Sequence, residues 1–275
     1  MWNSMKKIVL LLSLAFLPGA AFAQSTTVAA RTSVGAEYKI VKGLHLKAEE
    51  ELRIDDGFSS LASLRTTLGI SYKPIEYVKV GAGYTLISPW KNSTNAFNAP
   101  RHRAYGEVTG YLTFGDVQLS LKEKLQYTHR TFVSNVYQTN PNALTLKSRL
   151  KVAYKGWKVV TPSLGFEMRT ALNEPWGYTS GSVKTTKNSK RDYYDFTFSG
   201  YNHVYNNRYR GEVAADIRLA KHHHLIPYVL LDYCNDYEID TNGSDNWADD
   251  GVRLFSAEYV NAFRVSVCLA YEFHF

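Results

Sequence analysis

The last stretch of the chain, Phe263 to Phe275, constrains the fold more than any other part of the sequence. Its odd-numbered residues are apolar or aromatic, and its even-numbered residues are polar or small. Because side chains alternate sides along a β-strand, this stretch would form a strand with one apolar and one polar face. Half-buried strands of soluble proteins usually show this alternation over roughly four to eight residues, whereas roughly nine to eleven tilted residues cross a bilayer. The pattern therefore favours a membrane-spanning strand over a strand of a soluble all-β protein.

The chain ends on an aromatic residue of this strand. Tyr271, Phe273 and Phe275 all belong to its apolar face. Alternating aromatics with a terminal phenylalanine resemble the closing strand of bacterial outer-membrane β-barrels, which the barrel assembly machinery of that membrane reads. We therefore expect these three residues to act as a C-terminal assembly signal.

The N-terminal end has the features of a secretory signal peptide. Lys6 and Lys7 precede the apolar run Ile8–Leu17, and the small residues Ala21 and Ala23 follow it. The run is too short for a membrane-spanning helix, and the small-x-small pattern marks a cleavage site.

Cleavage after Ala23 would leave Gln24 as the first mature residue. The sequence thus predicts a signal peptide at residues 1–23 and one outer-membrane β-barrel domain at residues 24–275. Export through the inner membrane, followed by insertion into the outer membrane, is the expected localisation.

The net charge argues against a nucleic-acid-binding protein. The chain has 32 basic and 25 acidic residues and a formal net charge of +7, which falls to +5 when Lys6 and Lys7 leave with the signal peptide. The basic residues stand singly between aromatic ones, and an exported chain does not meet nucleic acid. The 20 tyrosines and 13 phenylalanines fit a barrel in which only alternate residues face lipid.

Alternation with period two recurs from Arg31 to the C-terminus, with turn residues between the runs. About twelve strands, within a range of roughly ten to fourteen, account for it. The predicted fold is therefore all-β, a transmembrane antiparallel up-and-down β-barrel. Asp192–Val204 and Tyr209–Leu219 are interpreted as separate strands. Long polar loops are expected at residues 88–100, 131–143, 173–190 and 237–261.

The order of turns and loops leaves one conflict open. Bacterial barrels carry short turns on the periplasmic side and long loops outside. If both chain ends lie in the periplasm, the short Lys42-Gly43 turn falls outside and some long loops fall inside. Either one strand is missed, or Asp192–Val204 or Val252–Asn261 is misassigned.

Short motifs give the chain a family resemblance. They are AEEELRI at Ala48–Ile54, VGAGYTLISPW at Val80–Trp90 leading to RHR at Arg101–Arg103, and NRYR at Asn207–Arg210. These segments resemble an uncharacterised family of small Gram-negative outer-membrane barrels, known only as a domain of unknown function (DUF2490-like). The resemblance extends over nearly the whole chain after the signal peptide. It implies a location and a fold, and it brings no catalytic residues with it.

The polar faces of the strands are rich in charge, and alternation directs those charges into the barrel, with more bases than acids. The inward set contains Glu49, Glu51, Arg53, Arg65, Arg103, Glu107, Lys147, Arg149, Lys151, Glu167, Arg169, Arg208, Arg210, Glu212 and Arg264. Glu49, Glu51, Glu107 and Glu167 could pair with the bases across the barrel.

The strand count decides what this charged interior does. A barrel of about eight strands is filled by its own side chains, whereas sixteen or more strands leave a channel. At about twelve strands two interpretations stay open. The preferred one is an interior largely closed by ion pairs, and the other is a narrow, mildly anion-favouring pore.

Two acids break the alternation, because Glu50 and Glu123 fall on the lipid-facing side. Such an acid costs least near a membrane interface, and Glu50 lies close to a strand end. Glu123 stands between Leu121 and Leu125 and needs either a β-bulge, which we prefer, or a neighbouring protein.

The histidines suggest two sites that have simpler explanations. His222, His223 and His224 could bind metal, but three consecutive residues do not converge in an extended chain, so a solvated turn is preferred. His102 could meet lipid A phosphates, against the simpler alternative of a polar rim. No metal site or cofactor is predicted.

Some outer-membrane barrels are hydrolases that pair a serine with a histidine near the lipid surface. The candidates His102, His129 and His203 have no partner in a local motif, and no GxSxG-like sequence occurs. The expectation leans away from an enzyme.

The two cysteines, Cys234 and Cys268, both point inward by alternation on consecutive strands. Directly opposed strand residues lie within disulfide range in an oxidising compartment. A disulfide and two free thiols are the alternatives, and the strand register decides between them.

The sequence thus predicts an outer-membrane barrel that contacts outer-membrane lipid, lipopolysaccharide and the barrel assembly machinery. Its expected role is a narrow channel for small solutes or a structural barrel with a charged, largely self-filled lumen. The alternative is a membrane-embedded lipid-modifying hydrolase of the phospholipase or lipid A deacylase type.

Overall fold

The computed structural model describes residues 25–55, 57–185, 192–242 and 252–275, and every regular element among them is a β-strand. The strands are β1 (Ser25–Val41), β2 (Leu44–Asp55), β3 (Ser60–Ile75), β4 (Val78–Lys91), β5 (Ala96–Phe97), β6 (Arg101–Phe114), β7 (Val117–Arg130), β8 (Asn142–Tyr154), β9 (Val160–Thr185), β10 (Asp192–Ala220), β11 (His223–Thr241) and β12 (Arg253–His274). The predicted signal peptide lies outside the described residues, and so do its cleavage residues Ala21, Ala23 and Gln24. In the described part of the chain, no helix is long and apolar enough to cross a membrane.

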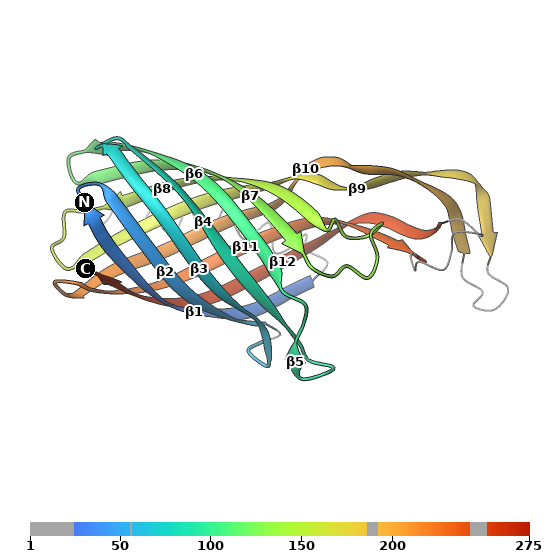
Figure 1. The fold of residues 1–275 in the computed structure, drawn as a ribbon, viewed down its shortest axis with the longest axis horizontal. Helices are drawn as coiled ribbons and strands as arrows, with labels where there is room; N and C mark the ends of the chain where they lie inside the picture. The colour runs from blue at the N-terminus through green and yellow to red at the C-terminus, as the bar shows by residue number, and fades with distance from the viewer. Residues whose placement is uncertain (1–24, 56, 186–191, 243–251) are drawn as a thin grey trace.

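Eleven of these strands close into one barrel, and the β3–β4 pairing joins the two ends of the sheet (Figure 1). The short β5 pairs only with the end of β4 and is not part of the barrel wall. The all-β barrel is confirmed, and its strand number is one fewer than the expected value of about twelve.

The first and last strands of the barrel run parallel, so the expectation of a purely antiparallel barrel was wrong. β1 pairs with β12 in parallel register from Ser25↔Ala262 to Glu37↔His274, whereas every other pair in the barrel is antiparallel. The reason is the odd strand number, because in an up-and-down order strands one and eleven point the same way.

The odd number also removes the conflict between turns and loops. The short turns and the C-terminal residue Phe275 lie at one end of the barrel, whereas Ser25 and the long connections lie at the other (Figure 1). The Lys42-Gly43 turn therefore belongs with the other short turns. Gly43 adopts a positive φ of 83°, and a Cβ there would lie 2.7 Å from the Lys73 carbonyl oxygen.

The strand count differs from the expected one because β10 is continuous. The runs interpreted as two strands are joined through Tyr205–Arg208, where the register with β9 shifts more than once. β-Bulges let an extended chain change which residues face inward without ending the strand. β9 likewise continues to Thr185 through the expected loop at residues 173–190, and β11 and β12 both enter the expected connection at residues 237–261.

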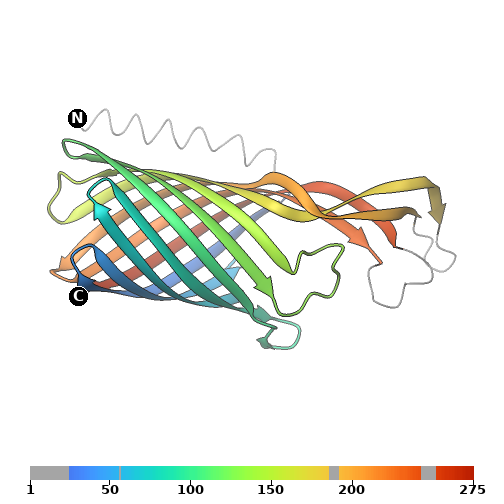
Figure 2. The ribbon, with the colours of Figure 1, turned by 45° about the horizontal axis from the view of Figure 1, so that its top comes forward.

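The prolonged strands β9 to β12 project beyond the barrel on the side of the long connections, and we call this part the extension (Figure 2). Its two hairpins meet where Tyr194 of β10 pairs with Leu254 of β12. Phe196, Ile239 and Leu254 form a buried apolar cluster between them, with exposed fractions of 8%, 6% and 5%. The extension therefore has an apolar core of its own.

The barrel wall has the opposite arrangement, with charge inside and apolar side chains outside. Arg31 and Asp232 on the inner face are 7% and 2% exposed, whereas Val34 and Leu68 on the outer face are 61% and 58% exposed. The outer belt of exposed apolar residues includes Val34, Leu68, Val80, Val108, Leu121, Leu125, Leu150, Phe166, Val213, Val229, Val267 and Leu269.

Candidate functional site: the charged lumen

The centre of the lumen holds a connected network of ion pairs. Nε and Nη2 of Arg210 donate to the two carboxylate oxygens of Asp232 at 2.5 and 2.8 Å. Arg31 lies 3.5 Å from the same carboxylate. Arg208 donates to Glu167 at 3.3 Å, and Arg210 lies 3.7 Å from Glu167. Asp232 is thus shared by Arg210 and Arg31, and Glu167 is shared by Arg208 and Arg210.

A second contact crosses one strand of the wall. Arg149 on β8 donates to Glu212 on β10 at 2.5 Å, above Gly165 of the intervening strand β9. A Cβ at Gly165 would lie 3.4 Å from Glu212 and 3.6 Å from the Arg149 guanidinium. Both are ordinary van der Waals distances, so the two long side chains meet over this position without crowding it.

The remaining predicted acids pair locally rather than across the barrel. The contacts are Glu51 with Arg53 at 2.6 Å and Arg65 at 3.8 Å, Glu49 with Lys47 at 2.8 Å, and Glu107 with Lys124 at 2.9 Å and Lys122 at 3.6 Å. Glu167 also finds its bases on the neighbouring strand β10. A base on the same or the next strand is already within reach, so the acids do not span the lumen.

The other predicted bases make weaker contacts with the wall. Arg103 donates to Thr128 at 2.9 Å. Arg264 donates to Thr27 at 3.3 Å and lies 3.9 Å from Asp55. Lys147, Lys151 and Arg169 take part in no salt bridge within the described residues.

Sequence reasoning missed Arg31, Asp232 and Lys47, which are central to the lumen. Lys47 joins Glu49 to Glu272 of the last strand, at 2.8 and 3.0 Å. Alternation on their strands would have placed all three inside, and the signal was present. What the sequence did not contain is that β1 closes against β12 and so brings Arg31 within reach of β11.

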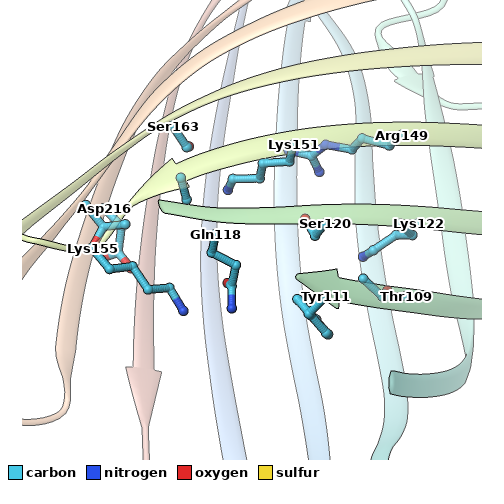
Figure 3. Close-up of a pocket in the computed structure, with 12 residues that line it drawn as sticks. Thr109, Tyr111, Gln118, Ser120, Lys122, Arg149, Lys151, Lys155, Ser163 and Asp216 are labelled. Atoms are coloured by element: carbon cyan, nitrogen blue, oxygen red, sulfur yellow. The ribbon is translucent and has the colours of Figure 1, made fainter. Parts of the chain in front are cut away.

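A cavity of about 310 Å³ opens in the lumen towards the short-turn end, and its polar lining is shown in Figure 3. Lys122, Arg149, Lys151 and Lys155 line it, and Asp216 is the one acid in that lining. The hydroxyl groups that line it belong to Thr109, Tyr111, Ser120, Thr161 and Ser163. Arg149 and Lys122 are paired with Glu212 and Glu107, so Lys151 and Lys155, with the surrounding hydroxyl donors, are the cations that suit a small anion.

Two further cavities lie in the lumen and have separate centres. One of about 270 Å³ is lined by residues of the central network, including Arg31, Arg210 and Glu212. Another, of about 180 Å³, lies towards the long-connection end beside Arg53, Arg65 and Arg101. The ion pairs thus divide the lumen into pockets.

Tyr105 fills part of the lumen on the side of β3 and β4. Its hydroxyl group lies where a Cβ of Gly69 or Gly83 would be, at 2.8 Å from the first position. The ammonium group of Lys124 stands 3.7 Å from the centre of the Tyr105 ring. Glycines on two strands therefore admit a tyrosine that narrows the interior and holds a lysine.

The register resolves the question of the cysteines. Cys234 pairs with Ala262, and Cys268 pairs with Tyr228, so the two thiols lie six positions apart along β12. At about 3.4 Å per residue this is far beyond disulfide range. Both cysteines are free thiols.

The outward acids find different surroundings. Glu123 accepts a hydrogen bond from the Ser148 hydroxyl at 2.6 Å across the β7–β8 pair. The register of β7 with both neighbours is uninterrupted, so the expected bulge at Glu123 is absent. Glu50 lies between Val34 and Thr66 in the wall, and its Oε1 is buried with no hydrogen-bond partner in the described part of the chain.

The three consecutive histidines turn to separate partners. Nδ1 of His222, His223 and His224 lies near the His274 carbonyl oxygen, the Tyr271 hydroxyl and the Asp216 carboxylate, respectively. The rings are therefore engaged with the wall at the short-turn end.

The C-terminal aromatic residues pack on the first strand and on each other. Phe275 donates its backbone N–H to the Glu37 carbonyl oxygen at 2.8 Å. Its ring lies 6.0 Å from Tyr38 and 4.3 Å from Phe273. The last residue thus contributes to the parallel seam.

The three histidines considered for catalysis are hydrogen-bonded to tyrosine or asparagine rather than to serine. His102 bonds to the Tyr84 hydroxyl at 2.5 Å, His129 to Asn142 at 2.8 Å, and His203 to the Tyr259 hydroxyl at 3.0 Å. In the ranges that the structure describes, no serine hydroxyl is hydrogen-bonded to a histidine ring.

Comparison with known proteins gives a family and no activity. The model of a family described as "Protein of unknown function (DUF2490)" matches residues 32–223, from within β1 to the first residue of β11. No curated protein matches the sequence.

Proposed function

Because the chain belongs to the DUF2490 family, whose description names no activity, we propose a function from the lumen itself. The protein is an outer-membrane β-barrel whose lumen is a narrow passage for small anions, constricted by its own ion pairs. The observation that carries this proposal is the cavity of about 310 Å³ lined by Lys122, Arg149, Lys151 and Lys155 against one acid.

The apolar belt supports a membrane location. Val34 on β1, Leu121 on β7 and Val267 on β12 are each more than half exposed. Water-soluble proteins rarely carry such a continuous apolar surface, whereas a barrel in a bilayer needs one. β6 and β7 have 14 residues each, more than the roughly nine to eleven that cross a bilayer. In this proposal the belt contacts outer-membrane lipid and lipopolysaccharide.

The balance of charge along the lumen supports anion preference. Lys147, Lys151 and Arg169 have no salt-bridge partner in the described part of the chain, whereas each of the acids Glu167 and Asp232 is shared by two arginines. A pore lined by excess positive charge favours anions over cations. The division of the lumen into separate pockets favours small ions and a low conductance.

The test is electrical recording of the purified mature protein in planar bilayers under a potassium chloride gradient. We expect small single-channel conductance and a reversal potential of the sign that anion selectivity gives. Lys155→Glu, in the exposed turn beside the cavity, should shift the reversal potential towards cations. Lys184→Glu, on the extension and half exposed, should leave it unchanged. Absence of any conductance, or cation selectivity of the wild type, would overturn the proposal.

A further inference from the structure

Four basic residues stand directly opposite one another in a row across four neighbouring strands. The register pairs Lys124 of β7 with Lys147 of β8, Lys147 with Arg169 of β9, and Arg169 with Arg208 of β10. Like charges directly opposite on a sheet destabilise it. We call these four residues the basic row. Such an arrangement needs a compensating negative charge.

The first member of the basic row is compensated by the protein itself. Lys124 lies 2.9 Å from Glu107 and over the face of the Tyr105 ring at 3.7 Å. A carboxylate and an aromatic face together satisfy one ammonium group.

Within the described residues, Glu167 is the one acid at salt-bridge distance from any of the other three members. Glu167 accepts a hydrogen bond from Arg208 at 3.3 Å, and it lies 3.7 Å from Arg210 of the central network. Lys147 and Arg169 have no salt bridge within the described residues. The interior around Glu167 therefore keeps an excess of positive charge.

Two donors of the basic row are buried and unused. The Nε atoms of Arg169 and Arg208 are buried and have no hydrogen-bond partner among the residues that the structure describes. Burying a charged donor without an acceptor costs free energy, so native proteins rarely leave one unsatisfied. Two such donors on directly opposed residues point to an acceptor that the chain itself does not provide.

We propose that Lys147, Arg169 and Arg208 form a binding site for one small tetrahedral oxyanion, sulfate or phosphate. The guanidinium groups present forked N–H donors that match an oxyanion, and the lysine adds a point charge. This inference rests on the proposed function, because it names the site at which the anion-favouring lumen holds its ion.

The site is distinct from the cavity in Figure 3. Along β8, Lys147 precedes Arg149 and Lys151, so it lies farther from the short-turn end than the residues that line the cavity. Arg149 is held by Glu212 and separates the two places. Substitutions in the basic row and in the cavity can therefore be compared.

The experiment measures sulfate and phosphate binding to the mature protein folded in detergent micelles. Titration calorimetry and the thermal midpoint are followed at constant ionic strength, with chloride as the reference ion. Binding at a specific site raises the stability of the folded protein in proportion to the logarithm of the ligand concentration above the Kd. General salt effects do not follow this dependence and show no saturable binding. We expect saturable binding of one oxyanion in the wild type.

The variants are Lys147→Met and Arg169→Gln, with Lys151→Gln as the matched control from the cavity. Each basic-row variant should weaken oxyanion binding about tenfold or more, the size expected for one charge-assisted hydrogen bond. Lys151→Gln should bind as the wild type does. In chloride alone, Lys147→Met should be at least as stable as the wild type, because methionine has a similar length and removes the charge that repels Arg169 and Arg208. If Lys147 had a purely structural role, the substitution would instead lower stability.

Three results would overturn the proposal: no saturable binding by the wild type, unchanged binding by both basic-row variants, or an equal loss in Lys151→Gln. Bilayer recording separates this inference from the proposed function. Anion conductance with unchanged oxyanion binding in both basic-row variants would refute the site and keep the passage. Loss of binding in those variants without conductance in the wild type would keep the site and refute the passage.

Discussion

Asp232 shows how single residues hold the lumen together. Its carboxylate is 2% exposed, accepts two hydrogen bonds from Arg210 and lies 3.5 Å from Arg31. Buried arginines without a carboxylate would keep their charge and lose its compensation, because guanidinium groups do not deprotonate readily. The stability of three strands, β1, β10 and β11, therefore depends on one acid.

We predict that Asp232→Asn lowers the free energy of unfolding by about 3–5 kcal/mol, the usual cost of leaving a buried charge unpaired. Urea unfolding of the protein folded in lipid vesicles measures it. Glu49→Gln is the control, because Glu49 is 27% exposed and its pair with Lys47 is partly solvated. Equal effects of the two substitutions would contradict the central role of Asp232.

The parallel seam between β1 and β12 is the element that closes the barrel. Thirteen residue pairs, from Ser25↔Ala262 to Glu37↔His274, define its register. Every other pair of neighbouring strands in the barrel wall is antiparallel, and its two strands follow each other along the chain, apart from the short β5. The seam alone joins the beginning of the described chain to its end.

Cross-linking tests the direction and register of this seam. In a background carrying Cys234→Ser and Cys268→Ser, the pair Thr32→Cys and Leu269→Cys should form a disulfide on oxidation, because these residues are direct partners. Thr32→Cys with Val265→Cys is four positions out of register, about 13 Å, and should not. The readout is gel mobility without reductant. A cross-link in the second pair with none in the first would disprove the register.

The extension is an element with its own chemistry outside the barrel wall. His203 stacks on Trp176 with ring centres 4.5 Å apart, and its Nε2 lies 3.0 Å from the Tyr259 hydroxyl. Burial among these rings lowers the pKa of His203 below its usual 6.5. The folded extension therefore binds fewer protons at this site than the unfolded chain does.

By linkage, the contribution of His203 to stability is fully present above the unfolded pKa of about 6.5 and is lost as the pH falls below it. We predict that the extension is proteolysed faster at pH 5.5 than at pH 7.5, while the barrel fragment survives. Gel electrophoresis of the digest measures both rates. His203→Gln should weaken this pH dependence. An unchanged pH profile in that variant would assign the effect to other groups.

At the scale of the whole molecule, charge and apolar surface are distributed in the reverse of a soluble protein. The barrel interior holds arginine, lysine and carboxylates, its exterior exposes aliphatic side chains, and the described apolar core cluster lies in the extension. A bilayer would surround such a wall with apolar lipid and leave water at both ends of the barrel. This distribution of charge and apolar surface supports the proposal of an outer-membrane location.

We predict that the protein from outer-membrane fractions migrates differently in detergent gels before and after boiling, as closed barrels do. Deleting Phe275 should lower the yield of the folded form, which is the band present only in the unboiled sample, because the backbone and the ring of Phe275 both contact β1. Tyr178→Ala, at a position 58% exposed on the extension, is the control. Equal yields from the two variants would argue against an assembly role for the terminal aromatic.

The amino-acid sequence by itself determined the strands and their faces. Period-two alternation is local, so the inward side of Glu51, Arg149 or Arg210 and the outward side of Leu121 could be derived from neighbours in the chain. The same alternation indicated the all-β class, and short motifs indicated the family. These features depend on a few consecutive residues, and no long-range contact is needed to specify them.

Tertiary structure alone decided how those strands close. The continuity of β10 depends on bulges against β9, and one strand fewer makes the seam parallel and gathers the short turns at one end. That seam brings Arg31 to Asp232. The register of β11 with β12 separates the thiols of Cys234 and Cys268, and the registers between β7 and β10 align the basic row. Register and closure depend on contacts between residues far apart in the chain. The alternation of polar and apolar residues is identical for a parallel and an antiparallel seam, so it cannot distinguish the two.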